Sequence, residues 1–446
     1  MFEHFRFVIL AVGLMCLTSL ACNYSIVNFS FICMTQDGND TIWIGNVQTR
    51  QRYEYSQHEK SMLHWAVAVG TMIGTFPVNW LYVKFGARLP FFCAGFLSAI
   101  ATGFTPFAAH LDLKAFIFLR FVQGLAYSAD FAAIGIIVVR WSPLTQTAIF
   151  ISFLTTFSSI ASMITNPIAG AFCTSSLGWR WTYYTFSAAT AVVFTIWIIL
   201  YRDDPHKHRS VSPRELNMIL DGKTKAHIER DSFMPYKEIC KDPVVLVIWF
   251  NAFTELVGYI IMLTYGPTYI HKVLGYSIGH TSYLSIIGAT LHFVLKLSSG
   301  FLSDLLSCLP EKIKMMFFNT FAVGISGILC GFIGFMSNGY LALLCLTASS
   351  SLSGMNVGGF YKCATLYSRQ YAHFVLAMVQ FSKCVALVAG PLTVAVFVKE
   401  DTDAKGWIMV FLFNGIVMII ANIAFYFTAT DQPAKFTEIT RETKKD

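Results

Sequence analysis

The chain has 446 residues, of which 55% are hydrophobic and only 13% are charged, and its formal net charge is +7. Soluble domains carry about 25% charged residues, so this composition excludes an ordinary soluble protein. The positive residues lie mainly in loops between apolar runs, so the net charge does not indicate a nucleic-acid partner. The expected partner is the lipid bilayer.

Twelve apolar stretches dominate the sequence, and each has the length of about 20 residues that crosses a bilayer as a helix. Lipid supplies no water for backbone amides, so a spanning segment must satisfy them within its own helix. The predicted spans are 7–29, 61–82, 90–109, 115–139, 147–172, 182–201, 244–265, 281–302, 316–336, 340–361, 375–397 and 407–428. The predicted fold class is therefore an all-α membrane protein.

A charged central segment divides these spans into two bundles of six. We predict an N-terminal six-helix bundle at 1–201, a cytoplasmic linker at 202–243, a C-terminal six-helix bundle at 244–430, and a cytoplasmic tail at 431–446. The linker is expected to be solvated, with a short helix that begins at Ser212-Pro213-Arg214-Glu215, because proline is favoured at a first helical position. The tail is polar and is expected to be disordered.

The first apolar run has a second interpretation, as a signal peptide. Arg6 precedes its apolar core, and small residues such as Ala21 follow. The run continues past Ala21 to Phe29, however, and its removal would leave five spans before the linker and six after it. These features favour a membrane span.

The basic residues predict the orientation of the spans. With both termini in the cytoplasm, inside segments hold 20 Lys and Arg residues and outside loops hold 8. The first outside loop contains the sequon Asn39-Asp40-Thr41, which predicts glycosylation of a lumenal or extracellular loop. The sequence is compatible with the plasma membrane and with an endolysosomal or vesicular membrane.

Neither the cysteines nor the other residues indicate an enzyme. The 11 cysteines lie mainly in apolar runs, without a CxxC pair or a Cys/His ligand spacing, so we interpret them as packing residues rather than metal ligands or disulfide partners. No nucleotide-binding loop, catalytic triad or metal-ligand set is visible in the sequence. We expect no cofactor, apart from a coupling proton or sodium ion.

The two halves repeat matching signals at matching positions. Gly178-Trp179 follows the fifth span, and Gly406-Trp407 precedes the twelfth. The fifth and eleventh spans contain Pro167 and Pro391, each followed by small and apolar residues. Such internal repeats predict a duplicated transporter fold, which places its substrate near the midplane between the halves.

The loop between the second and third spans carries a more specific signal. It reads Pro77-Val78-Asn79-Trp80-Leu81-Tyr82-Val83-Lys84-Phe85-Gly86-Ala87-Arg88, and the loop after the eighth span ends in Ser303-Asp304. The first of these resembles the cytoplasmic signature loop of the major facilitator superfamily, with Val83 in place of the usual acid. The resemblance implies gating roles for four residues: Lys84, Gly86, Arg88 and Asp304.

A narrower resemblance covers residues from about 7 to 435 and depends on the order and spacing of several segments. These are Phe118-Leu119-Arg120-Phe121-Val122-Gln123-Gly124, Arg140-Trp141-Ser142-Pro143, Tyr201-Arg202-Asp203-Asp204-Pro205-His206, Pro235-Tyr236-Lys237-Glu238 and Pro267-Thr268-Tyr269. They are similar to the anion:cation symporter family, which contains sialin, the vesicular glutamate transporters and the sodium–phosphate cotransporters. Membership implies rocker-switch transport of an organic anion or phosphate.

The residues that carry function in this family are only partly present. Three positions match family residues of the helices that bind substrate: Asn23, His64 and Arg120. Four positions depart from the family: Ala21 and Thr254 replace arginines, Tyr127 replaces a glutamate, and Gly135 replaces a histidine. The departures disfavour glutamate or sialic acid as the substrate and put the usual proton-coupling residue in doubt.

The insertion of an ionisable residue into a membrane span costs about 2.5–3.5 kcal/mol of free energy. Each such residue is therefore expected to have a structural or functional role. Arg120 either reaches the outer surface by snorkelling or donates hydrogen bonds to a carboxylate or phosphate. Asp130 is either a proton or cation site that replaces the lost glutamate or the counter-charge of a basic residue on a neighbouring helix. Its side chain is expected about 80° away from the face of Arg120.

In the second half, His292 and Lys296 lie four residues apart on one helical face. If this face lines the cavity, Lys296 is a second anion-binding charge and His292 a titrating neighbour. Alternatively, Lys296 is a structural tie to Glu255 or to Asp130.

These patterns favour a secondary active transporter of a small organic anion or inorganic phosphate, which works as an ion-coupled symporter and as a monomer. The expected substrate-binding residues are Asn23, His64, Arg120, Tyr127 and Lys296, and the expected coupling residues are Asp130, Glu255 and His292. The alternatives are a transporter-like sensor or scaffold that binds without turnover, and a carrier of a neutral or cationic solute.

Overall fold

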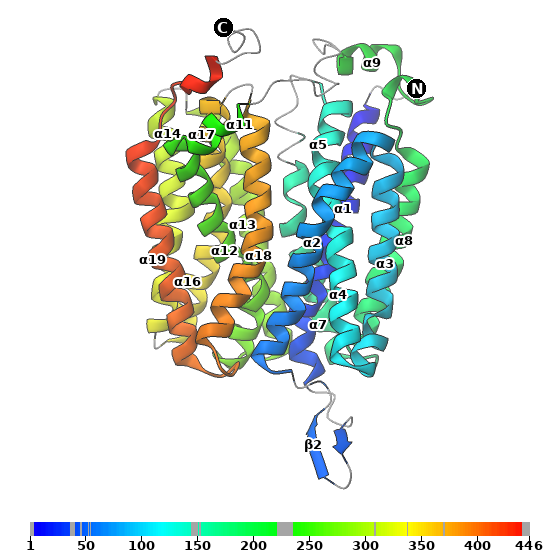
Figure 1. Cartoon of the computed structure of the whole chain (residues 1–446). Coiled ribbons are helices and arrows are strands. Elements are labelled where there is room, and N and C mark those ends of the chain that lie inside the picture. The colour runs from blue at the N-terminus through cyan, green and yellow to red at the C-terminus, as the bar shows by residue number, and fades with distance from the viewer. Residues whose placement is uncertain are drawn as a thin grey trace. The chain divides into compact units, whose positions relative to one another are not determined.

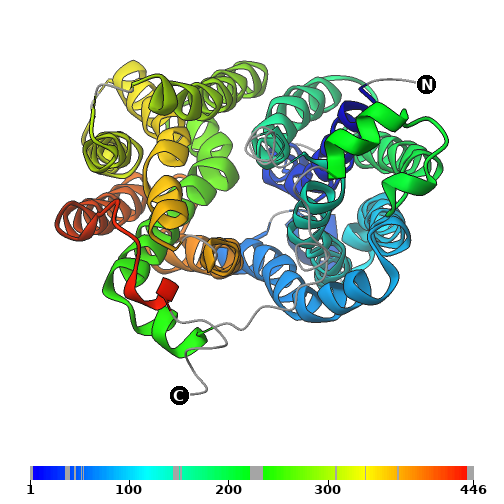
Figure 2. The same cartoon turned by 90° about the horizontal axis from the view of Figure 1, so that it is seen from above.

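The computed structural model describes residues 4–35, 41–44, 47–51, 53, 55–143, 150, 153–220, 235–306, 309–336, 338–368 and 371–438. The chain forms two compact units, Met1–Asp231 and Ser232–Asp446. Both consist mainly of long helices (Figure 1), and within each unit these helices are seen nearly end-on in the view from above (Figure 2).

The long helices of the first unit are α1 (Phe5–Met34), α2 (Gln57–Phe85), α3 (Arg88–Leu111), α4 (Leu113–Tyr127), α5 (Ala129–Trp141), α7 (Phe157–Thr174) and α8 (Arg180–Leu200). A short strand pair, β1 (Thr41–Ile44) and β2 (Val47–Gln51), follows α1 and is antiparallel. This hairpin was not predicted. The predicted glycosylation residue, Asn39, lies outside the described residues.

The second unit contains α11 (Tyr236–Lys241), α12 (Pro243–Lys272), α13 (Ile278–Leu305), α14 (Glu311–Asn319), the π-helical η3 (Thr320–Ile325), α15 (Ser326–Phe332), η4 (Ile333–Phe335), α16 (Gly339–Leu352), η5 (Ser353–Gly358), α17 (Phe360–Ser368), α18 (Ala372–Phe397) and α19 (Ala404–Thr428). The elements from α14 to η4 form one continuous span, and those from α16 to α17 form another.

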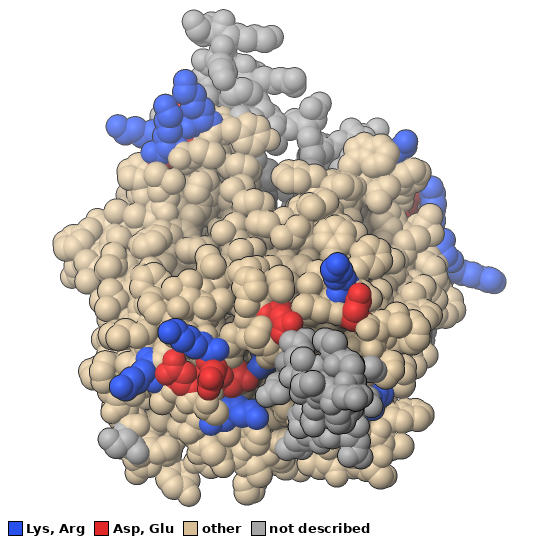
Figure 3. All heavy atoms as spheres, turned by 60° about the horizontal axis from the view of Figure 1, so that its bottom comes forward, with Lys and Arg blue, Asp and Glu red and all other residues tan. Residues whose placement is uncertain are grey.

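Eleven of the described helical segments are long and apolar enough to cross a membrane. The remaining predicted span, 147–172, corresponds to α7, in which Asn166 and Pro167 lower the apolar character. The prediction of an all-α membrane protein is confirmed. Figure 3 shows Lys, Arg, Asp and Glu gathered toward the two ends of the molecule, with a broad area between them that carries no charge.

Local sequence explains where several helices begin. Side chains at the N-cap accept hydrogen bonds from the first free amides of the helix. Ser56 and Glu59 form a capping box at α2, and Asp242 caps α12 just before Pro243. The other side-chain caps are Asp112 at α4, Ser277 at α13, Asn338 at α16 and Asp403 at α19.

The predicted fourth span is divided at Ser128, between α4 and α5. The Ser128 hydroxyl donates to the Leu125 carbonyl at 2.7 Å, and such back-bonding bends a helix. This break lies between Arg120 and Asp130, and the angle of about 80° was expected for a helix that continues without a break.

The tenth span changes from α-helix to 3-10 helix at η5, where three glycines allow neighbouring backbones to approach. A Cβ on Gly354 would meet the His292 carbonyl of α13, and a Cβ on Gly359 would meet Asn319 of α14. The small residues of this face therefore allow the tenth span to pack closely on α13 and α14.

Two segments that were expected to be loose are packed instead. In the predicted linker, the helix α9 (Pro213–Leu220) places Glu215 at the start of α1, and this side chain is only 2% exposed. Its carboxylate accepts from the Phe5 amide at 3.1 Å and the Arg6 amide at 2.9 Å, and it pairs with the Arg6 guanidinium at 3.1 Å. An acidic group suits a helix N-terminus, because the free amides there carry partial positive charge.

The tail also packs, as far as residue 438. Phe436 in η7 (Lys435–Glu438) is buried against Tyr367 and Tyr371, with ring centroids 5.9 and 6.2 Å away. The Ala434 amide donates to the Tyr367 carbonyl at 3.0 Å. The expectation of a disordered tail is therefore wrong for these residues. Two apolar residues in the mostly polar tail, Ala434 and Phe436, could have indicated that this part of the tail packs.

The interpretation of all cysteines as packing residues is wrong for one pair. Cys33, at the end of α1, forms a disulfide with Cys173, at the end of α7. The two positions are 140 residues apart, and neither lies in a recognisable motif. Only the side-by-side packing of α1 and α7 brings them together. Eight other cysteines in the described part of the chain are free thiols.

Candidate functional site

In the first unit, the central feature is the guanidinium of Arg120, which is buried with 1% of the residue exposed. Its Nη1 donates to the Tyr24 carbonyl and to Gln123 Oε1, both at 2.8 Å, and its Nε donates to the Leu63 carbonyl at 3.3 Å. The snorkelling alternative is therefore wrong. Without such acceptors, the burial of this permanent charge would cost a large amount of free energy.

The second terminal nitrogen of Arg120, Nη2, has no hydrogen-bond partner among the described residues. The acceptors on the other two nitrogens are two backbone carbonyls and one amide, so all three are neutral. The guanidinium thus keeps its full positive charge and two unused N–H donors. This is the arrangement that a carboxylate or phosphate would complete.

Two of the other predicted substrate residues lie close to this guanidinium. His64 on α2 is within electrostatic reach of Arg120, and its ring meets Phe31 edge-on at 5.9 Å. Tyr127 packs on Tyr24 with ring centroids 4.6 Å apart, and the Tyr24 carbonyl accepts from Arg120. The structure therefore brings His64 near Arg120 and links Tyr127 to Arg120 through Tyr24.

Asn23 has a different surrounding. Its amide donates to Ser98 on α3 at 2.9 Å and accepts from Thr190 on α8 at 3.3 Å. These bonds tie three helices of the first unit together, and Asn23 is fully buried. The contacts thus account for Asn23 as a packing residue without a ligand.

Asp130 is fully buried in the first turn of α5. It lies within electrostatic reach of Tyr82 and Cys16. Neither of the two roles expected for Asp130 is tested by these contacts, and both stay predictions.

In the second unit, Glu255 on α12 lies within electrostatic reach of Lys296 on α13 and Lys383 on α18, and beside the Asn356 amide. Of the two partners that the sequence offered for Lys296, Glu255 therefore lies near enough to feel its charge. Glu255 is 2% exposed, and its Oε2 has no hydrogen-bond partner among the described residues.

His292 lies next to the same group. Its Nδ1 is 2.9 Å from the Ser350 carbonyl and 3.1 Å from Ser353 Oγ, and its ring packs on Tyr259 at 4.6 Å between centroids. Because the Ser353 hydroxyl itself donates to the Ser350 carbonyl at 2.8 Å, Nδ1 acts as the donor to both oxygens.

The predicted gating residues lie at the helix ends. Gly86 has a φ of 75°, in the left-handed region that favours glycine, and ends α2. Asp203 accepts hydrogen bonds from the Ala87 and Arg88 amides at the start of α3. Asp203 follows α8 in the sequence and binds the turn between α2 and α3. In this turn, Val83 stands at the position where the signature loop usually has an acid. The Arg88 side chain donates to the Ile198 carbonyl at 2.8 and 3.1 Å.

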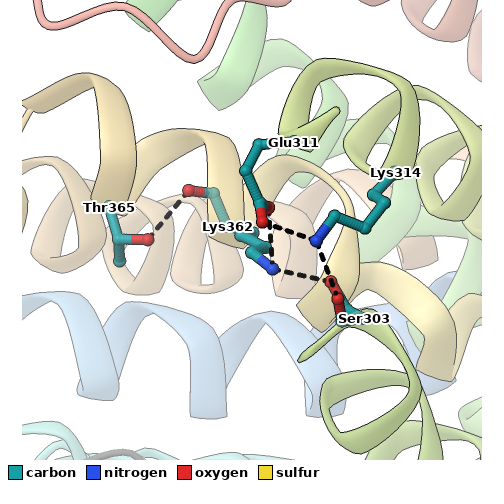
Figure 4. A network of polar contacts seen from close by, with 5 residues as sticks. All are labelled: Ser303, Glu311, Lys314, Lys362 and Thr365. Atoms are coloured by element: carbon teal, nitrogen blue, oxygen red, sulfur yellow. Dashed lines mark hydrogen bonds and ion pairs between the residues drawn. The ribbon is translucent and has the colours of Figure 1, made fainter. Parts of the chain in front are cut away.

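Lys84 lies over the rings of Trp80 and Phe85, at 4.9 and 5.3 Å, which is a cation–π arrangement. The side chain of Asp304 lies outside the described atoms. Its neighbour Ser303 instead belongs to a polar network that joins the ends of α13, α14 and α17 (Figure 4).

In this network, Glu311 pairs with both Lys314 and Lys362, the latter at 2.9 Å (Figure 4). Lys314 donates to the Ser303 carbonyl at 3.2 Å, and Lys362 donates to Ser303 Oγ at 2.8 Å. Three helix ends of the second unit are thus held by one acid and two bases.

Sequence reasoning missed several residues of both clusters. Gln123 lies three residues after Arg120 on the same helical face, and this spacing was the available signal. Ser349, Ser350, Ser351 and Ser353 form a serine run inside an apolar span, which is unusual enough to have marked it as polar interior. Asp203 carried no local signal, because its partners are more than 100 residues away.

The chain was compared with known families and structures. A family model described as "Major Facilitator Superfamily" matches residues 13–391. Sialin from Ovis aries is 23% identical over 384 residues, which cover 85% of this chain and 77% of sialin. The probable small intestine urate exporter from Homo sapiens is 25% identical over 385 residues, with 84% and 76% covered. Sodium-dependent phosphate transport protein 3 from Mus musculus is 22% identical over 369 residues, with 82% and 77% covered.

Solved structures share the same fold. A bacterial homolog of the human lysosomal transporter Spinster, in an inward-facing and occupied conformation, aligns with a TM-score of 0.70. The alignment covers 96% of this chain and 98% of that one, at 12% sequence identity. At this identity, the likeness concerns the fold alone.

Proposed function

The chain belongs to the major facilitator superfamily, and on that premise we propose that it carries a small organic anion or inorganic phosphate by ion-coupled symport. It is a multi-pass membrane transporter, not an enzyme. The proposal concerns the substrate, the coupling and the residues. The observation that carries it is the buried guanidinium of Arg120, whose Nη2 has no hydrogen-bond partner among the described residues.

A buried cation selects its substrate by charge. The guanidinium stays charged at any physiological pH, and its planar fork matches a carboxylate or phosphate. His64 and Tyr127 beside it supply further polar contacts to the same ligand. The relatives whose names mention urate and phosphate support an anion as the substrate class.

We assign the remaining roles as part of this proposal. Lys296 is a second anion-binding charge in the second unit, and Glu255 and His292 are its coupling neighbours. Asp130 is a further coupling candidate in the first unit. Lys84, Gly86, Arg88 and Asp304 act at the inner helix ends in gating.

An uptake screen tests the substrate class. Purified protein in proteoliposomes is expected to take up at least one of phosphate, urate, glutamate and sialate, with pH, sodium and voltage varied separately. The control is the same protein with Arg120→Gln. Saturable binding of an anion without any flux would instead favour a sensor or scaffold, and uptake of only neutral or cationic solutes would contradict the anion assignment.

We further propose that both termini are cytoplasmic. The basic residues favour this orientation, and the Cys33–Cys173 disulfide supports it, because it links the ends of α1 and α7 that would then face outward. Disulfides persist in oxidising compartments and are rare in the cytosol. The plasma membrane and an endolysosomal or vesicular membrane both provide such a compartment on the outer side.

The disulfide makes this orientation measurable. In sealed right-side-out vesicles, a membrane-impermeant maleimide is expected to label Cys33 and Cys173 only after an impermeant reductant is added. The double variant Cys33→Ser/Cys173→Ser is the control and should lose this reductant-dependent labelling. Labelling that requires permeabilised vesicles would place this end of the helices in the cytoplasm and reverse the orientation.

A further inference from the structure

The chain between β2 and α2 is attached to the rest of the first unit through Tyr53. This residue is 2% exposed, and its ring meets Trp179 edge-on, with the ring centroids 5.5 Å apart. Its hydroxyl lies 3.1 Å from Arg180 Nη2, at the start of α8, and 3.3 Å from His110 Nδ1, near the end of α3. One phenol oxygen thus joins the chain that leaves the hairpin to the ends of two helices.

The direction of each hydrogen bond at this oxygen follows from Arg180. A guanidinium has only donors, so Nη2 donates and the Tyr53 oxygen accepts. The phenol has a single hydrogen, which it donates to His110 Nδ1. His110 therefore accepts at Nδ1, which requires a neutral ring. The guanidinium also lies over the rings of Tyr53 and Trp179, at 5.7 and 5.0 Å, so its positive charge is held at this position.

A proton on His110 Nδ1 reverses the second of these hydrogen bonds. A protonated imidazole has no acceptor, so Nδ1 can then only donate to the Tyr53 oxygen. Two cations, Arg180 and His110, would donate to the same oxygen, and the phenol hydrogen would lose this acceptor. Like charges so close to each other repel, so the contacts favour the neutral ring. Because an imidazole changes its charge between about pH 5 and 8, this arrangement is sensitive to acid.

Other charged and titratable groups belong to the elements at this end of α3. They are Asp112 and Lys114 at the turn into α4, His58, Glu59 and Lys60 in the first turn of α2, and Arg180 on α8, while Arg52 and Glu54 lie outside the described residues. Asp112 and Lys114 adjoin His110 in the chain, so they stay near it whether or not Tyr53 is in place. Arg180 shares the Tyr53 hydroxyl with His110, so their repulsion acts on the contact that holds Tyr53.

We propose that Tyr53, His110 and Arg180 form an acid-sensitive clamp on the chain between the hairpin and α2. With a neutral His110, the ring accepts from Tyr53 and the clamp is closed. His110 is exposed, so it exchanges protons with water. When Nδ1 takes up one proton, its repulsion with Arg180 weakens the clamp and Tyr53 leaves its place between α3 and α8. The orientation proposed above exposes this end of the unit to the lumen or the cell exterior.

Hydrogen exchange of the full-length protein in liposomes, measured by mass spectrometry, tests the clamp. Labelling at about pH 5.5 and about pH 7.5 uses times scaled to the pH dependence of chemical exchange, so a remaining difference reports local opening. The wild-type segment 47–56 is expected to exchange about 5-fold or more faster at the lower pH. His110→Gln still offers an acceptor but takes up no proton, so it should show no difference. His58→Gln, at an exposed histidine of α2, is the matched control and should keep the difference.

Two further variants separate the effect of charge from a loss of packing. Tyr53→Phe keeps the ring on Trp179 and removes the hydroxyl, so segment 47–56 should exchange fast at both pH values. Arg180→Gln removes the permanent charge and keeps an N–H donor for the Tyr53 hydroxyl, so the segment should stay protected at both pH values. Only a clamp that charge repulsion opens gives these opposite results.

Three results would overturn the proposal. One is equal exchange of the wild-type segment at both pH values, another is a pH difference that persists in His110→Gln or Arg180→Gln, and the third is an acid effect that spreads through all helices of the first unit. The readout is structural, so it decides on the clamp whether or not the protein transports an anion.

Discussion

Arg120→Ala is expected to lower anion uptake by about 100-fold or more. Removing one partner of a buried, hydrogen-bonded charge pair costs about 2–5 kcal/mol, and each 1.4 kcal/mol is about tenfold in affinity. In the protein without substrate, the acceptors on this guanidinium are neutral, so its charge is available to a bound anion. The measurement is initial uptake in proteoliposomes at matched protein content.

Because Arg120 also connects α4 to carbonyls of α1 and α2, a structural effect must be separated from loss of binding. Arg120→Gln keeps a donor for these carbonyls and removes the charge, so it should fold like the wild type and still lose uptake. Arg120→Lys keeps the charge without the planar fork and should retain part of the uptake at a weaker apparent affinity.

Lys114→Ala is the matched control for these variants. Lys114 is an exposed base near the start of the same helix, and its removal should leave uptake unchanged. If a monodisperse Arg120→Gln protein transports with wild-type rate and apparent affinity, Arg120 does not bind the anion.

Glu215→Ala is expected to destabilise the first unit by about 3–5 kcal/mol, because it removes the carboxylate that pairs with the buried Arg6 guanidinium. The side chains of this pair are 4% and 0% exposed. The variant also removes the acceptor of two backbone amides at the start of α1. Thermal unfolding in detergent, followed by tryptophan fluorescence, should show a clear fall in Tm.

The double variant Arg6→Met/Glu215→Ala should recover part of the lost stability, since the buried positive charge is then absent as well. Asn217→Ala, an exposed position of the same short helix, should unfold like the wild type. A Tm for Glu215→Ala equal to that of the wild type would mean that α9 does not hold the start of α1.

Both predictions show how far local patterns reach. Arg120 was identified from its position in an apolar span, and the structure confirms that it is buried. Glu215 was identified only as part of a helix start, and nothing in its neighbourhood indicated that Arg6, 209 residues earlier, would pair with it. Its burial depends on α9 folding back onto α1.

The same distinction applies to the second unit. The spacing of His292 and Lys296 predicted a helical face with two ionisable side chains, since residues four apart lie on the same face of a helix. The nearness of Glu255 to Lys296 required the packing of α12 on α13, which the spacing of residues on one helix does not record. The hydrogen bonds between Ser326 on α15 and Ser349 on α16 required the packing of those two helices, so no single segment could indicate them.

The sequence by itself determined the class of protein, the membrane spans and the division into two helical halves. These properties follow from the local exclusion of polar groups from lipid, which each stretch of about 20 residues records separately. Tertiary structure alone decided that Cys33 meets Cys173, that Glu215 is buried against Arg6, and that Ser326 meets Ser349. Each of these depends on side chains from distant segments, whose contacts form only when the helices pack.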